Sequence, residues 1–474
     1  VVSMIGRYQG SHRNPDAMQA FVQHVISSKY EDLSEQAVQS TKTFILDSLG
    51  VMISGTLAPG VPETLQTLRY WGGRKESTIL VFGGKLPAPL AAMMNSFMLH
   101  NQEFDCVHDD AVLHPFTTAL PVALAVAESK GRITGKELLT AVALGVDVSC
   151  SIGVSSRSAM SFFRPGTAGA FGAVAAGGKL AGLDEETLNN AMGVAYSQIC
   201  GTLQPHHEGA MVISMQTGFN ARAATTAIAL AERGIIGASE VLEGKYGYFR
   251  LFEGEYEVDG VLANLGKVWQ VERVGHKPFP TGRLTQGVIE AALSLSETYN
   301  IEPQDIVACE AMVSPLVERL VGRPLDHDNP SAQYAKLSIP FVVATALIRK
   351  TVFISDFWVS ALSDPLIHSM ARRISVVRDP QILDENAMMP IRLRITLKTG
   401  TVHELRLEQM MGHPDKGLTK EQHLNKFEAC WDAGAAHLPS DHRERLVEVV
   451  DRLDELESVD EIIRLLTPRT GLIG

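Results

Sequence analysis

Residues 103–121 of this 474-residue chain read EFDCVHDDAVLHPFTTALP, and they concentrate side chains that bind protons or metal ions. Carboxylates and imidazoles are the groups that most readily move protons near neutral pH. We therefore expect a pocket for proton transfer in this segment. Six such groups lie within twelve positions: Glu103, Asp105, His108, Asp109, Asp110 and His114.

Two other interpretations of the same segment stay open. An exposed loop between helices would carry these charges simply solvated, although the flanking segments are too apolar for a surface position. A metal site would use the imidazoles of His108 and His114, with a carboxylate from Asp105 or Asp110. Their spacing matches no strong metal signature, so we expect no metal.

The segments on either side predict buried helices. Residues 32–55 offer Ser34 as an N-terminal cap, an apolar face and Gly55 as a stop. Residues 90–104 are apolar around most of the helix circumference, which is typical of a buried helix. Residues 166–182 are nearly all Gly and Ala, so helix backbones can approach closely there. The spacing around Gly178-Lys179 fits neither a phosphate-binding loop nor a dinucleotide fingerprint.

After about residue 270 the pattern becomes mixed. Residues 307–322 can supply a strand and residues 335–350 a helix, and residues 389–409 alternate like a hairpin around a Lys-Thr-Gly turn. The tail returns to a helical pattern. We predict a mainly α fold with a large helical domain, residues 1–269 and 409–474, and a smaller α+β lid, residues 270–408. Ligand sites favour such domain interfaces.

Composition narrows the functional classes. The net charge of −12 and the lack of a dense basic stripe disfavour nucleic-acid binding. No apolar run reaches about 18 uncharged residues, so no membrane span is expected. Five scattered cysteines without a CxxC pair predict reduced thiols and a cytoplasmic location. The first residues, VVSMIGRYQG, lack a signal-peptide pattern, and the missing initiator Met suggests that the encoded chain begins earlier.

Several segments, taken in order, resemble the MmgE/PrpD family over nearly the whole chain. The opening segment is similar to the family's DFDDTH…HP. The other matching segments are RPGTAGAFGAVAAGGKLAGLDEETLNNAMGVAYSQICG, EGAMVISMQTGFNARAA, VLEGKYGYF, HKPFPTGRLTQGVIEAAL, SAQYAKLSIPFVVATALI and GHPDKGLTKEQHLNKF. The family includes 2-methylcitrate dehydratase, cis-aconitate decarboxylase and iminodisuccinate epimerase. The resemblance implies a helical domain with an α+β lid, a homodimer, and cofactor-free lyase or isomerase chemistry on small di- and tricarboxylates.

The resemblance also implies roles for individual residues. His114 matches the family's His-Pro histidine, which donates or accepts a proton, while Glu103 stands where the family has Asp and Asp105 matches a second acid. With His108 from the same segment, these are our catalytic candidates. Lys277, in HKPFP, matches a lysine that lines the cleft from the lid. Arg283 is close by in sequence and can clamp a carboxylate with both arms of its guanidinium group.

This chain departs from the family at four positions. Arg164 stands where the family often has His, and a permanent cation cannot shuttle protons. Ile213 replaces a Lys, Gln216 a His and Val107 a Thr. The changes favour a less charged substrate or one held from another side. Nearby histidines can compensate, and our candidates for binding the substrate are Lys277, Arg283, Arg164, His206, His207 and Gln216.

From these residues we expect a dehydratase-type lyase, similar to 2-methylcitrate dehydratase, that acts on a small hydroxy-polycarboxylate without a cofactor. An isomerase or epimerase and a decarboxylase similar to cis-aconitate decarboxylase are the alternatives. A catalytically inert binding protein with the same fold is a further alternative. Retained charges argue against it, because buried charge without a partner costs several kcal/mol. The expected partners are a small anionic carboxylate and a second copy of the chain, with neither nucleic acid nor membrane.

Overall fold

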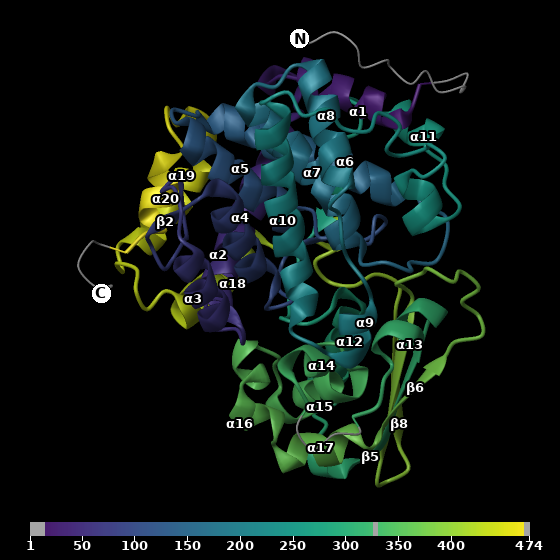
Figure 1. Cartoon of the computed structure of the whole chain (residues 1–474). Coiled ribbons are helices and arrows are strands. Elements are labelled where there is room, and N and C mark those ends of the chain that lie inside the picture. Colours follow the sequence, from purple (N-terminus) through teal and green to yellow (C-terminus); the bar gives the residue numbers. More distant parts are fainter. Residues whose placement is uncertain (1–14, 326–329, 469–474) are drawn as a thin grey trace.

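The computed structural model describes residues 15–325 and 330–468, so the N-terminal segment without a signal-peptide pattern lies outside the described residues. The chain before the lid is mainly helical, as expected (Figure 1). Its helices are α1 (Ala17–Ser27), α2 (Glu35–Gly55), α3 (Val61–Trp71), α4 (Ala88–His100), α5 (Phe116–Lys130), α6 (Gly135–Ser155), α7 (Arg164–Ala181), α8 (Glu185–Tyr196), α9 (Gln204–Glu208), α10 (Val212–Ala231) and α11 (Asp259–Leu262).

Local sequence signals explain several of these helices. The side chain of Ser34 accepts a hydrogen bond from the backbone N–H of Ala37, so the expected cap starts α2. Helix α4 is buried along almost its whole length. Helix α7 contains the Gly/Ala-rich segment and crosses α6 closely: a Cβ atom at Gly172 would lie 2.3 Å from the carbonyl oxygen of Gly145. Close helix packing is therefore the role of the small residues.

The C-terminal tail packs on the helical domain. It forms α18 (Lys420–Gly434), α19 (His442–Asp451) and α20 (Asp460–Leu465). Figure 1 shows these yellow helices beside the purple and blue ones. Phe427 and Leu446 from the tail belong to the same hydrophobic core as α2 and α5. The tail thus lies where the sequence predicted, whereas the domain boundaries at residues 269/270 and 408/409 stay a prediction.

The lid has a second hydrophobic core around a mixed sheet, with strand order β6-β5-β7-β8. Strands β5 and β6 are parallel, and the other neighbours are antiparallel. Its strands are β5 (Ile306–Val313), β6 (Ile374–Arg378), β7 (Ile391–Leu397) and β8 (Val402–Leu407). Its helices are α12 (Gln286–Thr298), α13 (Pro315–Val321), α14 (Ala332–Lys336), α15 (Ile339–Arg349), α16 (Val359–Leu362) and α17 (Pro365–Ala371).

The β7–β8 pair is the expected hairpin. Ile391, Leu393 and Ile395 are buried on one face, which matches the alternation in the sequence. The mainly α fold with a small α+β domain is thereby confirmed.

Two short pairs of strands complete the fold. Strands β1 (Ser77–Thr78) and β2 (Lys85–Leu86) form a small, largely buried antiparallel pair in the helical domain. Strand β3 (Val107–His108) pairs antiparallel with β4 (Val274–Gly275). The second pair matters for function, because it joins the polar segment that follows α4 to the segment that leads into the lid. Residues far apart in the sequence are brought together at this point.

One described helix, α6, has the length and hydropathy of a membrane span. In this structure 94% of its apolar window is buried inside the protein. Burial of this kind is what a core helix of the large domain requires.

The close crossing of α6 and α7 predicts a large effect of added volume. Replacing Gly172 by Val should lower the free energy of unfolding by about 1–3 kcal/mol or more, because the new Cβ would meet backbone. Urea denaturation would measure the loss. The control is Gly417→Ala, whose added Cβ has its nearest neighbour at 3.8 Å and should change little. Equal effects of the two substitutions would contradict this packing.

Candidate active site

The polar segment after α4 is largely buried rather than a solvated loop. Glu103 is 4% exposed, and Asp105 and His108 are fully buried. Glu103 also has a φ of +53°, a backbone conformation that side chains other than Gly rarely adopt. The interpretation as an exposed loop is therefore wrong for these residues. Strain and buried charge at one place are typical of functional sites.

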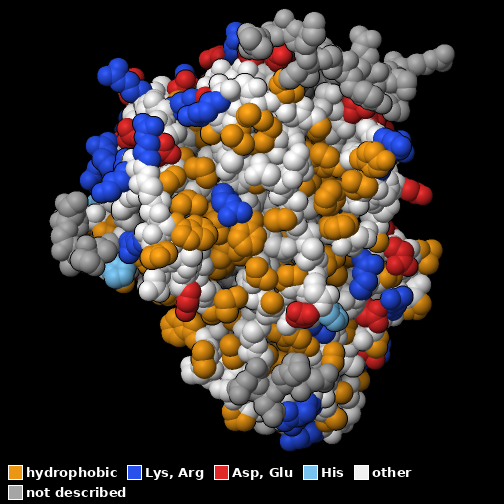
Figure 2. Space-filling model, in the orientation of Figure 1, with side chains coloured by type: hydrophobic (Ala, Val, Ile, Leu, Met, Phe, Trp, Pro, Cys, Tyr) orange, Lys and Arg blue, Asp and Glu red, His pale blue; other side chains and the backbone are white. Residues whose placement is uncertain are grey.

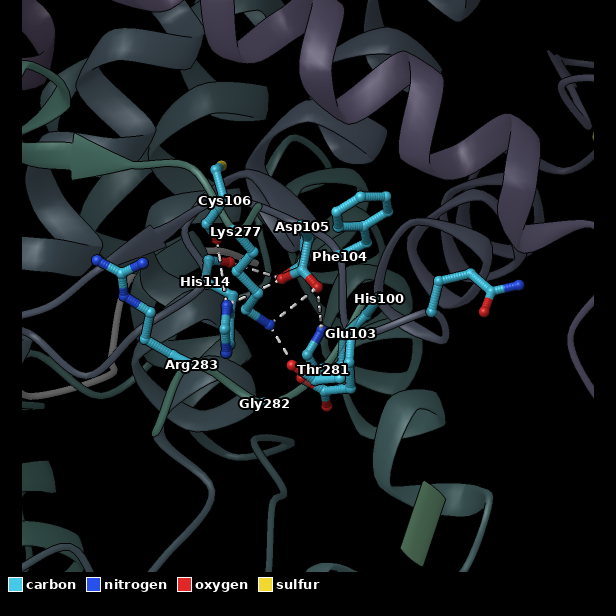
Figure 3. Close-up of polar contacts among 12 residues, drawn as sticks. His100, Glu103, Phe104, Asp105, Cys106, His114, Lys277, Thr281, Gly282 and Arg283 are labelled. Atoms are coloured by element: carbon cyan, nitrogen blue, oxygen red, sulfur yellow. Dashed lines mark hydrogen bonds and ion pairs between the residues drawn. The ribbon is translucent and has the colours of Figure 1, made fainter. Parts of the chain in front are cut away.

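A cluster of charges joins this segment to the lid (Figure 3). The ammonium group of Lys277, just after β4, donates a 2.9 Å hydrogen bond to Glu103 Oε2 and lies 3.6 Å from Asp105 Oδ1. His100, the last residue of α4, lies with Nδ1 3.2 Å from Asp105 Oδ1. Lys277 and His100 are themselves fully buried. These four residues form a buried ionic cluster whose members depend on one another.

The cluster sets the protonation states of its members. Burial raises the pKa of Glu103, but the charges of Lys277 and His100 outweigh burial and lower it to about 2. The pKa of Asp105 is likewise well below its ordinary value, because Lys277 and His114 outweigh the effect of burial. Burial lowers the pKa of Lys277, and the two carboxylates more than reverse this. The ammonium and both carboxylates are therefore charged at neutral pH.

His114 lies at the edge of this cluster and faces a cavity. Its Nδ1 is 2.9 Å from Asp105 Oδ2 and hydrogen-bonds the carbonyl oxygen of Cys106 at 3.2 Å. Both neighbours are acceptors, so Nδ1 carries the proton and Nε2 holds a free electron pair. Burial, followed by the nearby Lys277 charge, lowers the pKa of His114. His114 is therefore a neutral base at physiological pH.

The cavity beside His114 lies between the two domains and has a volume of about 80 Å³. Glu103, His114 and His206 are among its polar lining residues. Most of the remaining lining is apolar, including Val107, Ile213 and residues of the lid. The free nitrogen of a base thus faces a mainly apolar cavity between the two domains.

Two arginines expected to bind substrate are already occupied. Arg164 is 4% exposed, and it makes two hydrogen bonds to the carboxylate of Glu253, at 3.0 and 2.7 Å. Arg283 grips Asp109 in the same way, at 2.8 and 2.7 Å, and its remaining arm donates to backbone carbonyls. Arg283 does clamp a carboxylate, but the carboxylate belongs to the protein. Both guanidinium groups therefore have acidic partners inside the protein, and their expected role in holding the substrate stays a prediction.

Three other candidates also differ from expectation. The ring of His108 contacts Gln270 Oε1 at 3.0 Å and the backbone N–H of Ala111 at 3.2 Å, and it does not line the cavity. His108 therefore fastens the segment to Gln270 at the start of the predicted lid, and its expected role in catalysis stays a prediction. Gln216 bonds both ways with the backbone of Thr202, which makes it structural.

The two neighbouring histidines separate in space. His206 lines the cavity beside His114, whereas His207 lines only a larger adjoining hollow. Burial and the Arg323 charge lower the pKa of His206 to about 4, so it is neutral.

The sequence reasoning missed two residues of the site. His100 lies three positions before Glu103, on the end of α4 that faces the cluster, and its spacing was the available signal. Lys336, in α14, is 2% exposed and reaches across the interface to Gln102 Oε1 at 2.7 Å. Burial lowers its pKa to about 7. No pattern in the neighbouring sequence indicated that Lys336 belongs to the site, because its partners come from the other domain.

The metal interpretation involves different residues from those expected. Within residues 15–325 and 330–468, the group with metal-ligand geometry is Asp47, His276 and His423, all buried. Lys426 Nζ lies 2.7 Å from Asp47 Oδ1, so an ammonium ion already balances this carboxylate. The expectation of a site without metal stays a prediction.

Comparison with known proteins agrees with this architecture. The profile of the MmgE/PrpD N-terminal domain matches residues 19–260, and that of the MmgE/PrpD C-terminal domain matches residues 279–455. The chain belongs to the MmgE/PrpD family. It is 26% identical to cis-aconitate decarboxylase of Mus musculus over 94% of this chain and 93% of that protein. It is 25% identical to cis-aconitate decarboxylase of Aspergillus terreus, over 92% and 93% respectively. These relatives support a lyase role.

The buried Lys336 predicts a specific dependence of stability on pH. Its pKa is about 7 in the folded protein and about 10.4 in an unfolded chain, so the unfolded state binds more protons between these values. Its contribution to the free energy of unfolding should therefore rise from pH 7 to 9, by at most about 1.4 kcal/mol per pH unit. Urea titrations of wild type and Lys336→Met would measure it. Parallel pH dependences of the two proteins would rule it out.

Proposed function

We propose that this chain dehydrates a small hydroxy carboxylic acid by acid–base chemistry without a cofactor, with His114 as the catalytic base. The carrying observation is the state of His114: its Nδ1 is held by two acceptors, and its Nε2 has no partner among the described residues. Its lowered pKa keeps that nitrogen free of a proton. A group poised to remove a proton suits elimination better than a group that must first donate one.

In the proposed reaction, one histidine both removes the proton and returns it. Nε2 takes the proton from the carbon next to the substrate carboxylate, and the electron pair of that C–H bond forms the new C=C bond. The C–O bond on the neighbouring carbon breaks, and the leaving hydroxide takes the proton back from the imidazolium, so water is released. His206 lies on the same cavity wall and can hydrogen-bond the leaving hydroxyl.

The buried ionic cluster has two roles in this proposal. An ammonium group has three hydrogens, and Glu103 and Asp105 engage two directions of Lys277. The third is left for the substrate carboxylate, whose negative charge increases as the proton leaves. Asp105 positions His114 by holding its Nδ1 side, which fixes both the tautomer and the direction of Nε2.

Decarboxylation is the second candidate, favoured by the activity named for the relatives and by the apolar cavity. Here the C–C bond to a carboxylate breaks, carbon dioxide leaves, and the electron pair left on carbon takes a proton from a protonated His114. The two reactions need opposite forms of one imidazole. We further propose a homodimer in the cytoplasm. The exposed apolar side chains of Val212 and Leu230 on α10, and of Met211 at its N-cap, favour association. Figure 2 shows hydrophobic side chains gathered on this face of the molecule.

Substitution of His114 tests the proposal directly. His114→Ala should lower kcat by about 10²–10⁴-fold, because a general base contributes that much. Its melting temperature should stay near that of wild type, since Asp105 keeps Lys277 and His100 as neighbours. Proton NMR in heavy water with hydroxy acids would follow dehydration and solvent exchange. The control is His207→Ala, outside the reaction cavity. Full turnover by His114→Ala would move the role to His206.

The pH profile separates the two candidate reactions. His114 must be neutral to start dehydration, and burial together with the Lys277 charge lowers its pKa from the ordinary value. Dehydration should therefore be constant through neutral pH, and kcat/KM should fall only as the pH drops through that lowered pKa. Decarboxylation needs the protonated form and should accelerate over the same acidic interval. Initial rates between pH 4.5 and 8 would distinguish them, and a rise in rate toward acid would exclude dehydration.

Chelation tests the expectation of a metal-free site. Activity on the true substrate should survive prolonged dialysis against EDTA, because the proposed steps use only imidazole, ammonium and carboxylate groups. The control is the same dialysis without chelator. Loss of activity that a divalent metal restores would contradict the proposal and direct attention to Asp47, His276 and His423.

A further inference from the structure

The reaction cavity has few polar groups for a site that would hold several carboxylates. Beside Glu103, His114, His206 and Arg283, its walls are mainly hydrocarbon. The apolar walls come from both domains and include Val107, Val112, Ile213, Leu320, Leu337 and Met388. A ligand that fills this space must present hydrocarbon to most of it, since polar groups placed there lose their hydration without replacement.

The cations around the cavity are already paired within the protein. The guanidinium groups of Arg283 and Arg164 each make two hydrogen bonds to a carboxylate. Lys277 already serves two carboxylates, through a hydrogen bond to Glu103 and an ion pair with Asp105, and its side chain is fully buried. Among residues 15–325 and 330–468, no arginine lining this cavity is left without an acidic partner.

The charge balance therefore limits the substrate. Burial lowers the pKa of His100, but the charges of Asp105 and Glu103 outweigh burial and raise it. With its proton, His100 joins Lys277 in balancing the charges of Glu103 and Asp105, so this cluster has no surplus cation for a substrate with several carboxylates. A second or third carboxylate would lie against hydrocarbon, and burying an unpaired charge is strongly unfavourable.

We propose that the substrate has a single carboxylate and an apolar substituent of several carbons. This inference rests on the elimination proposed above. In that reaction the substrate is a 3-hydroxy acid and the product is the 2-enoic acid. The carboxylate lies toward Lys277 and His114. The substituent packs against Val107, Ile213 and Leu320.

The larger hollow that adjoins the reaction cavity, lined by His207, limits the length of a substituent that hydrocarbon can enclose. It shares Met160, Leu203, His206 and Leu320 with the reaction cavity and has a volume of about 860 Å³. Its other walls are more polar and include Glu318 and Arg323. A short chain is enclosed by hydrocarbon, whereas a longer one emerges between these charged side chains. Affinity should therefore rise with chain length and then level off.

Calorimetric binding of product-like acids to the full-length protein tests the inference. The probes are the 2-enoates with four, six and eight carbons, with cis-aconitate as a tricarboxylate of similar size. Affinity should rise about fourfold for each buried methylene group. The six-carbon acid should bind at least ten times more tightly than cis-aconitate. Tighter binding of cis-aconitate, or no dependence on chain length, would overturn the proposal.

A charge placed on the apolar wall provides a matched test. Leu320→Lys should lower the affinity for the six-carbon acid at least tenfold and raise the affinity for cis-aconitate, because an unpaired ammonium group then faces the cavity. The control is Leu366→Lys, at a position 65% exposed and outside the cavity, which should leave both affinities unchanged. Met388→Lys, on the same wall, replaces Leu320→Lys if circular dichroism shows that the latter is unfolded. Unchanged preference in a folded cavity variant would refute the inference.

His114→Ala separates this inference from the proposed reaction. The variant should keep the order of affinities while losing dehydration and exchange. Retained turnover with the expected affinities would refute only the role of His114. Tighter binding of cis-aconitate together with loss of turnover would refute only the substrate class.

Discussion

The ion pair between Lys277 and Glu103, with Asp105 beside it, is the constraint on which the rest of the site depends. These groups are almost completely buried, and isolated charges would be strongly unfavourable there. Each becomes acceptable only because its partners lie within hydrogen-bonding or close ionic distance. Removing one partner would leave the others uncompensated, which typically costs about 3–5 kcal/mol. The polar segment and the start of the lid are therefore held in one arrangement.

The same principle explains why the arginines around the cavity do not compete with this cluster. A guanidinium group cannot lose its proton in a protein, so a buried one needs a permanent acceptor. Glu253 and Asp109 supply that acceptor to Arg164 and Arg283 through paired hydrogen bonds. Their charges are thereby neutralised locally. Lys277 and His100 are instead shared between Glu103 and Asp105, so these charges gather in one buried cluster beside a mainly apolar cavity.

Sequence reasoning succeeded where the signal was local. The Ser34 cap, the alternation in β7 and the small residues of α7 each specify an element through its own neighbours. The prediction that Lys277 and residues 103–114 belong to one site came from the family resemblance, not from the local sequence pattern. The partners of the arginines were beyond reach, because Glu253 follows Arg164 by 89 positions and Arg283 follows Asp109 by 174. Type and spacing cannot reveal whether such a side chain is free or already bound in the fold.

Two histidines beside one carboxylate show how position, rather than residue type, divides the chemical roles. His100 and His114 approach different oxygens of Asp105, and their ring centres are 5.1 Å apart. His100 lies between two carboxylates, whose charges outweigh burial and raise its pKa. His114 lies at the cavity edge, where burial and the Lys277 charge outweigh the attraction of Asp105 and lower its pKa. One imidazole is thus suited to balance charge and the other to accept a proton, and opposite shifts in neighbouring groups are how one site assigns acid and base.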